Sequence, residues 1–329
     1  MSCYHPNYMV QIEGQMTVEG KPMYRMIKML DVDSYPKDKV IQVPCGKCIG
    51  CRLEYSRQWA NRCMLELQYH DSAFFCTFTY DQAHVPIGYS VDRSTGEAVE
   101  CMTLRKRDFQ LLMKRIRKRF SDDRIRFFAA GEYGSDTFRP HYHAILFGLH
   151  LGDLAVYKET YGGNVLYNSP SLDRCWFDSD GVPVGFVVVA PVTWETCAYV
   201  ARYTAKKECT ADPKVFQELG MEPPFTLMSR KPGIGRMYYD DHPDLYEHDF
   251  INVSTLKGGK KFRPPKYFDR LLEADRPLEA AKLKEVRREL AMQHEALVEA
   301  RTSMNEYDRR LMQERIKQGQ LKSLRRNQI

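Results

Sequence analysis

Two histidines stand one residue apart in the segment RPHYHAILFG, Arg139 to Gly148, at the start of an apolar run. Because alternate side chains of a strand point to opposite faces, His141 and His143 are predicted to share one face, roughly 6–7 Å apart. The pair alone is a weak signal, since histidines also pack in cores and lie on surfaces. Glu132 strengthens it, because the turn GSDTFRP would fold this residue back beside the histidines from the preceding strand.

One carboxylate and two imidazoles would form an open three-ligand site with room for water or substrate oxygens. Mixed oxygen and nitrogen ligands suit Mn²⁺ or Mg²⁺ with a phosphate substrate, and Zn²⁺ is the alternative. Such an ion polarises a phosphoryl oxygen and orients the group under attack. These residue types therefore indicate metal-assisted chemistry on a phosphate.

A second set of reactive side chains lies in YVARYTAKK, which belongs to a helix predicted from Thr193, as N-cap, to Lys207. Tyr199 and Tyr203 are four residues apart, so both hydroxyls are expected on one helix face, about 6 Å apart along the axis. Lys206 and Lys207 follow about one turn further on. A packed pair of core tyrosines is the alternative. Beside a metal and lysines, however, a phenol with a pKa of about 10 can act as a nucleophile.

Taken together, these segments resemble the HUH endonucleases. RPHYHAILFG is similar to their His–hydrophobic–His motif, with Tyr142 in the middle, GEY to the segment with the acidic ligand, and AFFCTFTYD to the first motif strand. YVARY resembles the paired-tyrosine motif of the replication initiators of small icosahedral single-stranded DNA phages. VPCGKCIGCR and MSRKPGIGR are similar to the gokushovirus branch of the Microviridae. The resemblance extends from about Cys3 to Phe268.

The resemblance implies an α+β fold with a central five-stranded antiparallel sheet and flanking helices. It also implies a rolling-circle replication initiator, a site-specific endonuclease and strand transferase that nicks phage origin DNA. The products are a 5′-phosphotyrosine and a free 3′-OH primer, and the displaced single strand is later rejoined into a circle. The implied metal ligands are Glu132, His141 and His143, and the implied catalytic residues are Tyr199, Tyr203, Lys206 and Lys207.

No phosphate-binding loop is visible, because GIG (Gly233 to Gly235) lacks the strand and the GK[ST] context of such a loop. Unwinding is therefore expected from a host helicase, together with the host replication machinery. The expected location is the cytoplasm of the bacterial host. No run of about 18 apolar residues is present, and no membrane partner is expected.

The segment CGKCIGC places Cys45, Cys48 and Cys51 at two-residue spacing, which favours a structural Zn²⁺ over a set of buried thiols. A fourth ligand is required, and Cys3 or His5 is expected to supply it. An iron–sulfur cluster is the alternative, although nothing in the chain indicates electron transfer. No export signal is recognised at the N-terminus, so the remaining cysteines are expected to be reduced thiols.

Basic residues are concentrated in two places, although the net charge of the 329 residues is only +6. Leu104 to Arg119 holds eight Lys/Arg against the single Asp108, and KGGKKFRPPK forms the second cluster. Both indicate a polyanionic partner, with a solvated helix face as the alternative. The apolar stripe of the first cluster should pack on a sheet and leave the basic face outward. DNA contacts are expected from Arg105, Lys106, Lys114, Arg115 and Lys118.

The order of predicted elements favours an antiparallel sheet with helices packed on one face. Its strands are expected at 73–80, 124–134, 139–148 and 185–192. Three domains are expected: residues 1–55, with the cysteine cluster, packed on the catalytic domain; the endonuclease domain, 56–272; and a charged amphipathic tail, 273–329. The tail is predicted as one long helix, either a coiled-coil arm or a strut folded over the body.

Two other classes of function remain open. A transposase or relaxase would use the same site on different DNA, although the tyrosine pair favours the initiator. In a non-enzymatic, zinc-bearing single-strand binding protein, the histidines and tyrosines would serve packing alone. Cleavage of an origin oligonucleotide separates this last class from the two enzymes.

Overall fold

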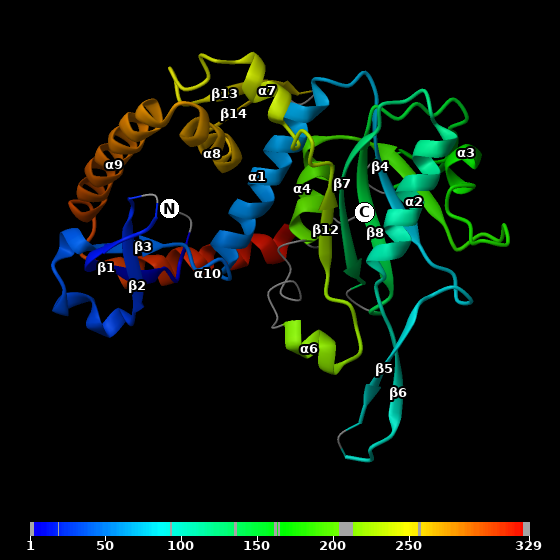
Figure 1. Cartoon of the computed structure of the whole chain (residues 1–329), viewed down its shortest axis with the longest axis horizontal. Coiled ribbons are helices and arrows are strands. Elements are labelled where there is room, and N and C mark those ends of the chain that lie inside the picture. Colours follow the sequence, from blue (N-terminus) through cyan, green and yellow to red (C-terminus); the bar gives the residue numbers. More distant parts are fainter. Residues whose placement is uncertain are drawn as a thin grey trace. The chain divides into compact units, whose positions relative to one another are not determined.

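Figure 1 shows a computed structural model of the chain, in which residues 3–18, 20–92, 94–134, 137–160, 163, 165–203, 213–255 and 258–324 are described. The chain divides into two compact units. The first holds Met1–Glu54 and Ala291–Gln328, and the second holds Tyr55–Leu290. Among the described residues, none of the helices combines the length and the apolar character needed to cross a membrane.

The second unit is built on a seven-stranded antiparallel sheet with the strand order β12-β7-β8-β4-β11-β10-β9. Its strands are β4 (Ala73–Thr79), β7 (Arg126–Tyr133), β8 (Pro140–Phe147), β9 (Ala155–Glu159), β10 (Val165–Asn168), β11 (Val187–Pro191) and β12 (Phe225–Met228). The α+β class is confirmed, but the expected count of five strands is wrong. The four strands predicted from the sequence form the centre. The strands β9, β10 and β12 were missed because each has only four or five residues, and β9 is exposed throughout.

Helices cover both faces of this sheet, so the expectation of helices on one face is also wrong. The helices α1 (Ile49–Leu67) and α4 (Trp194–Tyr203) contribute to the apolar core on one face. The helices α2 (Lys106–Arg119) and α3 (Pro170–Asp173) contribute to the core on the other (Figure 1). The reason lies in β7 and β8, which are buried along almost their whole length and therefore need cover on both sides.

The rest of the second unit consists of short elements around this sandwich. One hairpin projects from it, and a second hairpin packs with three helices in a separate apolar cluster that includes Leu65 of α1 (Figure 1). These elements are β5 (Ile87–Val91), β6 (Ala98–Met102), α6 (Pro213–Glu218), α7 (Arg236–Asp241), β13 (Ile251–Thr255), β14 (Gly258–Phe262), α8 (Lys266–Asp275) and α9 (Pro277–Glu299).

The first unit contains a three-stranded antiparallel sheet of order β2-β1-β3, together with the beginning of α1, the end of α9, and α10. Its remaining elements are β1 (Asn7–Met16), β2 (Pro22–Ile27), two short 3₁₀ helices η1 (Met29–Ser34) and η2 (Lys37–Lys39), β3 (Val40–Val43) and α10 (Glu306–Leu324). Arg310 of α10 donates to Gln42 Oε1 of β3 (2.7 Å), which ties the last helix to the sheet.

The single long C-terminal helix expected from the sequence is two helices in the structure. The helix α9 ends at Glu299, and α10 begins at Glu306. Asn305 causes the restart, because its Oδ1 accepts a hydrogen bond from the backbone N–H of Asp308 (2.9 Å), as an N-cap does. The alternating apolar pattern continues across this break, and periodicity alone therefore did not reveal it.

Candidate functional site

The structure brings Glu132, His141 and His143 together at one end of the central sheet. Glu132 of β7 lies directly opposite His141 of β8 in the strand register. Oε1 of Glu132 is 2.8 Å from Nε2 of His141 and 3.1 Å from Nε2 of His143. Glu132 and His143 are buried, and His141 is half-buried. One potential ligand atom from each residue lies within 4.8 Å of the other two, so this triad could hold a metal ion.

Hydrogen bonds on the far side of each ring orient the two imidazoles. Nδ1 of His141 donates to the carbonyl oxygen of Arg139 (3.1 Å), because a carbonyl can only accept. Nδ1 of His143 is 2.9 Å from Oγ1 of Thr77, which lies opposite it on β4. Metal-binding histidines commonly use the second ring nitrogen in this way, which leaves Nε2 to face the ion. The sequence analysis missed Thr77, whose only signal was a polar residue within the apolar strand AFFCTFT.

Charge within the triad is strongly coupled. Burial raises the pKa of Glu132, but hydrogen bonds from His141 and His143 and their charge outweigh burial and lower the pKa to about 2. The carboxylate is therefore ionised throughout the neutral range. An anionic oxygen beside two imidazole nitrogens is a donor set that suits a divalent cation.

Tyr142, the middle residue of the His–Tyr–His segment, points to the opposite face and is fully buried there. Its hydroxyl donates to the carbonyl oxygen of Arg105 (2.8 Å) and lies 2.7 Å from the hydroxyl of Tyr80. Burial is the main cause that raises the pKa of Tyr142, so this phenol stays neutral. Tyr142 therefore connects the start of α2 to the sheet and is not a nucleophile.

The helix α4 packs on β7 and β8, on the same face of the sheet as the triad. Thr193 caps its first turn, because its Oγ1 accepts from the backbone N–H of Thr196 (3.1 Å). The carbonyl oxygen of Ala198 accepts from Oγ of Ser56 on α1 (3.0 Å). The backbone of α4 includes positions 199 and 203. The side chains of Tyr199 and Tyr203, and all of Lys206 and Lys207, lie outside the described residues.

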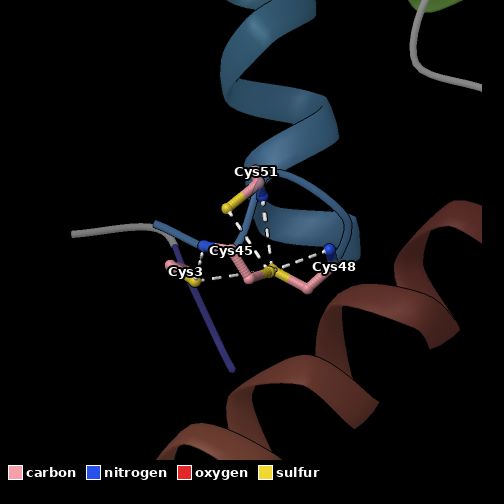
Figure 2. Close-up of side chains that lie close together, drawn as sticks. All are labelled: Cys3, Cys45, Cys48 and Cys51. Atoms are coloured by element: carbon pink, nitrogen blue, oxygen red, sulfur yellow. Dashed lines mark hydrogen bonds between the residues drawn. The ribbon is translucent and has the colours of Figure 1, made fainter. Parts of the chain in front are cut away.

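In the first unit, Cys3 joins the three thiols around the start of α1 (Figure 2). One sulfur–sulfur distance is 3.9 Å, between Cys48 and Cys3, and another is 4.0 Å, between Cys45 and Cys51. Four thiolates bound tetrahedrally to zinc at about 2.3 Å lie about 3.8 Å apart, which is close to these values. The four thiols could therefore hold a metal ion. His5, the other expected fourth ligand, instead pairs with Glu314 Oε2 at 2.6 Å.

Backbone N–H groups surround the sulfurs of this cluster. Cys48 Sγ accepts from the N–H of Tyr4 (3.4 Å) and of Cys51 (3.5 Å). Cys45 Sγ accepts from the N–H of Cys48 (3.3 Å), and Cys3 Sγ accepts from that of Cys45 (3.3 Å). Burial raises the pKa of Cys48, but these N–H donors and the neighbouring thiols lower it by more, to about 7. The chain thus stabilises a thiolate, the form that binds metals.

The two basic clusters lie in different places in the second unit. The helix α2 buries Phe109, Leu112, Met113 and Ile116 against the sheet and turns its basic side outward, as predicted. Of the expected DNA contacts, Arg105, Lys106, Lys114 and Lys118 are exposed and Arg115 is half-buried. However, α2 covers the face opposite the triad. The second cluster falls largely on β14, where Lys260 Nζ lies 3.6 Å from the ring centroid of Trp194, the first residue of α4.

The segment MSRKPGIGR is held by its backbone. Arg62 donates to the carbonyl oxygen of Ile234 (3.0 Å), and Arg126 donates to that of Pro232 (2.8 Å). The N–H of Gly235 donates to Oε2 of Glu66 (2.6 Å). Gly235 also has φ +77°, a backbone conformation that favours glycine. This segment therefore connects α1, β7 and α7 within the second unit.

Comparisons with known proteins identify the family. Residues 73–208 match the family model of the replication-associated protein ORF2. The chain is 33% identical over 235 residues to the replication-associated protein ORF2 of Spiroplasma virus 4, and this alignment covers 71% of this chain and 68% of that protein. It is 28% identical over 242 residues to the replication-associated protein VP4 of Bdellovibrio phage phiMH2K, with the same coverages.

A third relative is the replication-associated protein ORF4 of Chlamydia phage 1, which is 28% identical over 191 residues, or 55% of this chain and 43% of that protein. No solved structure gives a significant match. The class defined by these relatives is that of phage replication-associated proteins, which confirms the resemblance seen in the sequence. The chain belongs to the family of the replication-associated protein ORF2.

Proposed function

We propose that this protein initiates rolling-circle replication of a phage genome by nicking origin DNA through a tyrosine. The main support is the convergence of Glu132, His141 and His143 on the face of the sheet where α4 packs. The family supports a role in replication, and the relatives are replication-associated proteins by name. The expected partners are single-stranded phage origin DNA and, for unwinding, a host helicase.

The triad is proposed to bind Mg²⁺ or Mn²⁺, which would polarise the scissile phosphate. Glu132 supplies the anionic ligand, and the two imidazoles supply Nε2. The carbonyl of Arg139 and the hydroxyl of Thr77 keep both rings in position, so the ligands are oriented before the phosphate arrives. In this arrangement the triad binds and orients the substrate, while the nucleophile comes from α4.

In the proposed reaction, the phenol oxygen of Tyr199 or Tyr203 attacks the phosphorus. The bond from phosphorus to the 3′ oxygen breaks, the phenol loses its proton, and the 3′ oxygen gains one to become the 3′-OH primer. Lys206 and Lys207 are proposed to stabilise negative charge on the phenolate or the phosphate. The reaction exchanges one phosphodiester for another, so the phosphotyrosine retains the energy of the cut bond.

Two nucleophiles suit a process that needs two cuts. One tyrosine would hold the first 5′ end while the other attacks the regenerated origin after one circuit of the genome. Attack of the new 3′-OH on the first phosphotyrosine then closes the displaced strand into a circle. The cluster of Cys3, Cys45, Cys48 and Cys51 is proposed to bind a structural Zn²⁺ in the first unit.

The test is adduct formation with a single-stranded origin oligonucleotide and Mn²⁺, followed by peptide mapping of the trapped adduct. Wild-type protein should form a covalent 5′ adduct on Tyr199 and Tyr203. Tyr199→Phe and Tyr203→Phe should each retain partial nicking but fail to close circles, because closure needs two attacks. The double variant should bind the oligonucleotide and form no adduct.

Two results would overturn parts of this proposal. An adduct confined to Tyr203, with Tyr199→Phe able to close circles, would make this a one-tyrosine enzyme. Binding without any adduct from wild-type protein would favour the non-enzymatic single-strand binding protein. Tyr142→Phe is a matched control, because this buried tyrosine lies in the same segment as the ligands but faces away from them.

A further inference from the structure

A row of four residues crosses the central sheet at the end that carries the triad. Glu132 pairs with His141, and His141 pairs with Thr79. The register between β4 and β11 pairs Val187 with Phe78, which places Phe186 beside Thr79. Residues directly opposite each other in antiparallel strands share a face. Phe186 therefore lies on the triad's face, about 10 Å from His141, because the spacing between neighbouring strands is about 4.8 Å.

The side chain of Phe186 is 72% exposed, although it belongs to the middle of the sheet. Its neighbours on the same face of β11, Val188 and Ala190, are half-buried and buried. Leaving a phenyl ring in water forgoes the stabilisation that burying it would bring. An exposed ring next to a buried triad is therefore a feature to be explained by what it contacts when a substrate binds.

The backbone at Phe186 is held in place by close contacts with the end of β4. The carbonyl oxygen of Phe186 accepts from the N–H of Thr79 (2.9 Å) and from its Oγ1 (3.3 Å). A Cβ at Gly185 would lie 2.0 Å from the carbonyl oxygen of Thr79, so only glycine permits this approach. The position of the ring along the row is thus determined by the backbone.

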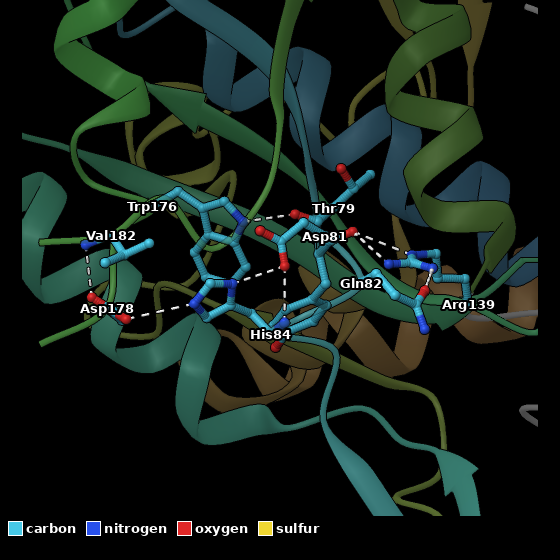
Figure 3. A network of polar contacts seen from close by, with 9 residues as sticks. Thr79, Asp81, Gln82, His84, Arg139, Trp176, Asp178 and Val182 are labelled. Carbon is cyan, nitrogen blue, oxygen red and sulfur yellow. Dashed lines mark hydrogen bonds and ion pairs between the residues drawn. The ribbon is translucent and has the colours of Figure 1, made fainter. Parts of the chain in front are cut away.

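The strand end beside the ring is fixed by a network of polar contacts (Figure 3). The indole of Trp176 donates to the carbonyl oxygen of Thr79 (2.8 Å), and Arg139 donates to that of Tyr80 (3.2 and 3.1 Å) and to Oε1 of Gln82 (3.0 Å). Arg139 also supplies a positive charge near the triad, two residues before His141. A phosphate approaching the triad would therefore meet a rigid, cationic rim.

A second exposed ring lies on the other side of the triad. Phe138 is 58% exposed and belongs to the turn between β7 and β8, three residues before His141. Its φ of +52° is rare for a bulky residue. The turn is closed by hydrogen bonds of 3.0 Å from the N–H of Phe138 to the carbonyl of Gly134 and from the N–H of Gly134 to the carbonyl of Arg139.

We infer that Phe186 and Phe138 are stacking platforms for unpaired bases that flank the phosphate bound at the triad. Bases stack on aromatic side chains whatever their sequence, because each base presents a π face. A stacked strand advances about 3.4 Å per nucleotide, so the 10 Å between His141 and Phe186 corresponds to about three nucleotides. The inference rests on the proposed function, because it requires DNA at the triad.

The first experiment measures binding without cleavage. Fluorescence anisotropy in EDTA compares wild-type protein, Phe186→Ala, Phe138→Ala and Phe186→Trp on a single-stranded origin oligonucleotide. Each alanine variant should bind about tenfold more weakly, and Phe186→Trp should bind at least as well as wild type. Tyr157→Ala is the matched control, because Tyr157 is 60% exposed on β9 of the same sheet and should not affect binding.

The second experiment locates the stacked base. Abasic sites are placed one at a time within four nucleotides of the nick, and binding is measured with wild type and with Phe186→Ala. At the stacked position, the abasic site should weaken wild-type binding and have almost no further effect on the variant. Additive losses at every position, or unchanged binding by Phe186→Ala, would overturn the inference. So would a change of oligomeric state in Phe186→Ala without a change in DNA affinity, since the ring would then contact another copy of the chain.

These readouts separate the inference from the proposed function. If wild-type protein forms the phosphotyrosine adduct but the abasic losses are additive, the platforms fail and the nicking function stands. If binding depends on Phe186 but no adduct forms with Mn²⁺, the platforms stand and the nicking function fails.

Discussion

Replacement of Glu66 is expected to destabilise the second unit by several kcal/mol, although this residue lies outside the proposed catalytic site. The carboxylate on α1 is completely buried. Its Oε2 accepts from the N–H of Gly235 (2.6 Å), and its Oε1 pairs with Arg126 and lies 3.3 Å from Nε2 of His70. This side chain therefore links α1 to β7 and to the segment MSRKPGIGR.

The magnitude follows from burial and charge. Removing one partner of a buried ion pair leaves the other charge uncompensated and costs about 3–5 kcal/mol. Glu66→Gln keeps the shape and one acceptor oxygen, so we expect a loss of about 3 kcal/mol. Glu66→Ala also leaves a cavity, so its loss should be larger, about 4–5 kcal/mol. Asp240→Asn is the control, because it removes only the partly exposed pair with Arg236 and should cost less than about 1 kcal/mol.

The pH dependence has a definite sign. Burial raises the pKa of Glu66, but its contacts with His70, Gly235 and Arg126 lower it by more, so the pKa lies below the usual value. A carboxyl group with a lowered pKa stabilises the fold fully above its unfolded pKa of about 4.3 and loses that contribution as the pH falls further. The stability difference between wild type and Glu66→Gln should therefore be constant from pH 6 to 8 and shrink below about pH 4.3.

Urea unfolding followed by tryptophan fluorescence measures this loss in the correct unit. All three tryptophans, Trp59, Trp176 and Trp194, belong to the second unit, so the signal reports on that unit. A loss for Glu66→Gln below about 1 kcal/mol at pH 7 would refute the reasoning, since it would equal that of an exposed pair. A loss that persists unchanged at pH 3 would also refute it, because the carboxylate would then not be its source.

Three further predictions concern the metal sites and DNA. His143→Ala should keep the fold but abolish nicking, as chelation should do to wild type; near-normal nicking by the variant with titrated Mn²⁺ would exclude this ligand. The purified protein should contain about one tightly bound Zn²⁺ per chain by elemental analysis, and Cys48→Ser should lower the melting temperature. Iron with a visible absorption band, or no zinc, would contradict the structural zinc. Lys114→Ala and Lys118→Ala should weaken binding to all DNA sequences equally and flatten its salt dependence, whereas a selective loss of origin preference would indicate base contacts.

Local patterns in the sequence were sufficient for the centre of the fold and for the candidate ligands. The four longest buried segments form the middle of the sheet, because runs of apolar residues with two-residue alternation reflect burial that acts over a few residues. The spacing of His141 and His143, and the short turn from Glu132, determine which side chains meet across β7 and β8. These are short-range relations, which a chain encodes within about ten residues.

Only the tertiary structure decided the relations between distant segments. Cys3 reaches the thiols of Cys45, Cys48 and Cys51 because β1 pairs with β3, a pairing that separates Cys3 from His5 as a ligand. The basic helix α2 covers the face opposite the triad, although it precedes β7 directly in the chain. The exposed ring of Phe186 joins the triad's row through the register of β4 with β11, more than 100 residues apart. Strand order, register and the choice of face depend on which apolar surfaces bury one another best, and that competition involves the whole chain.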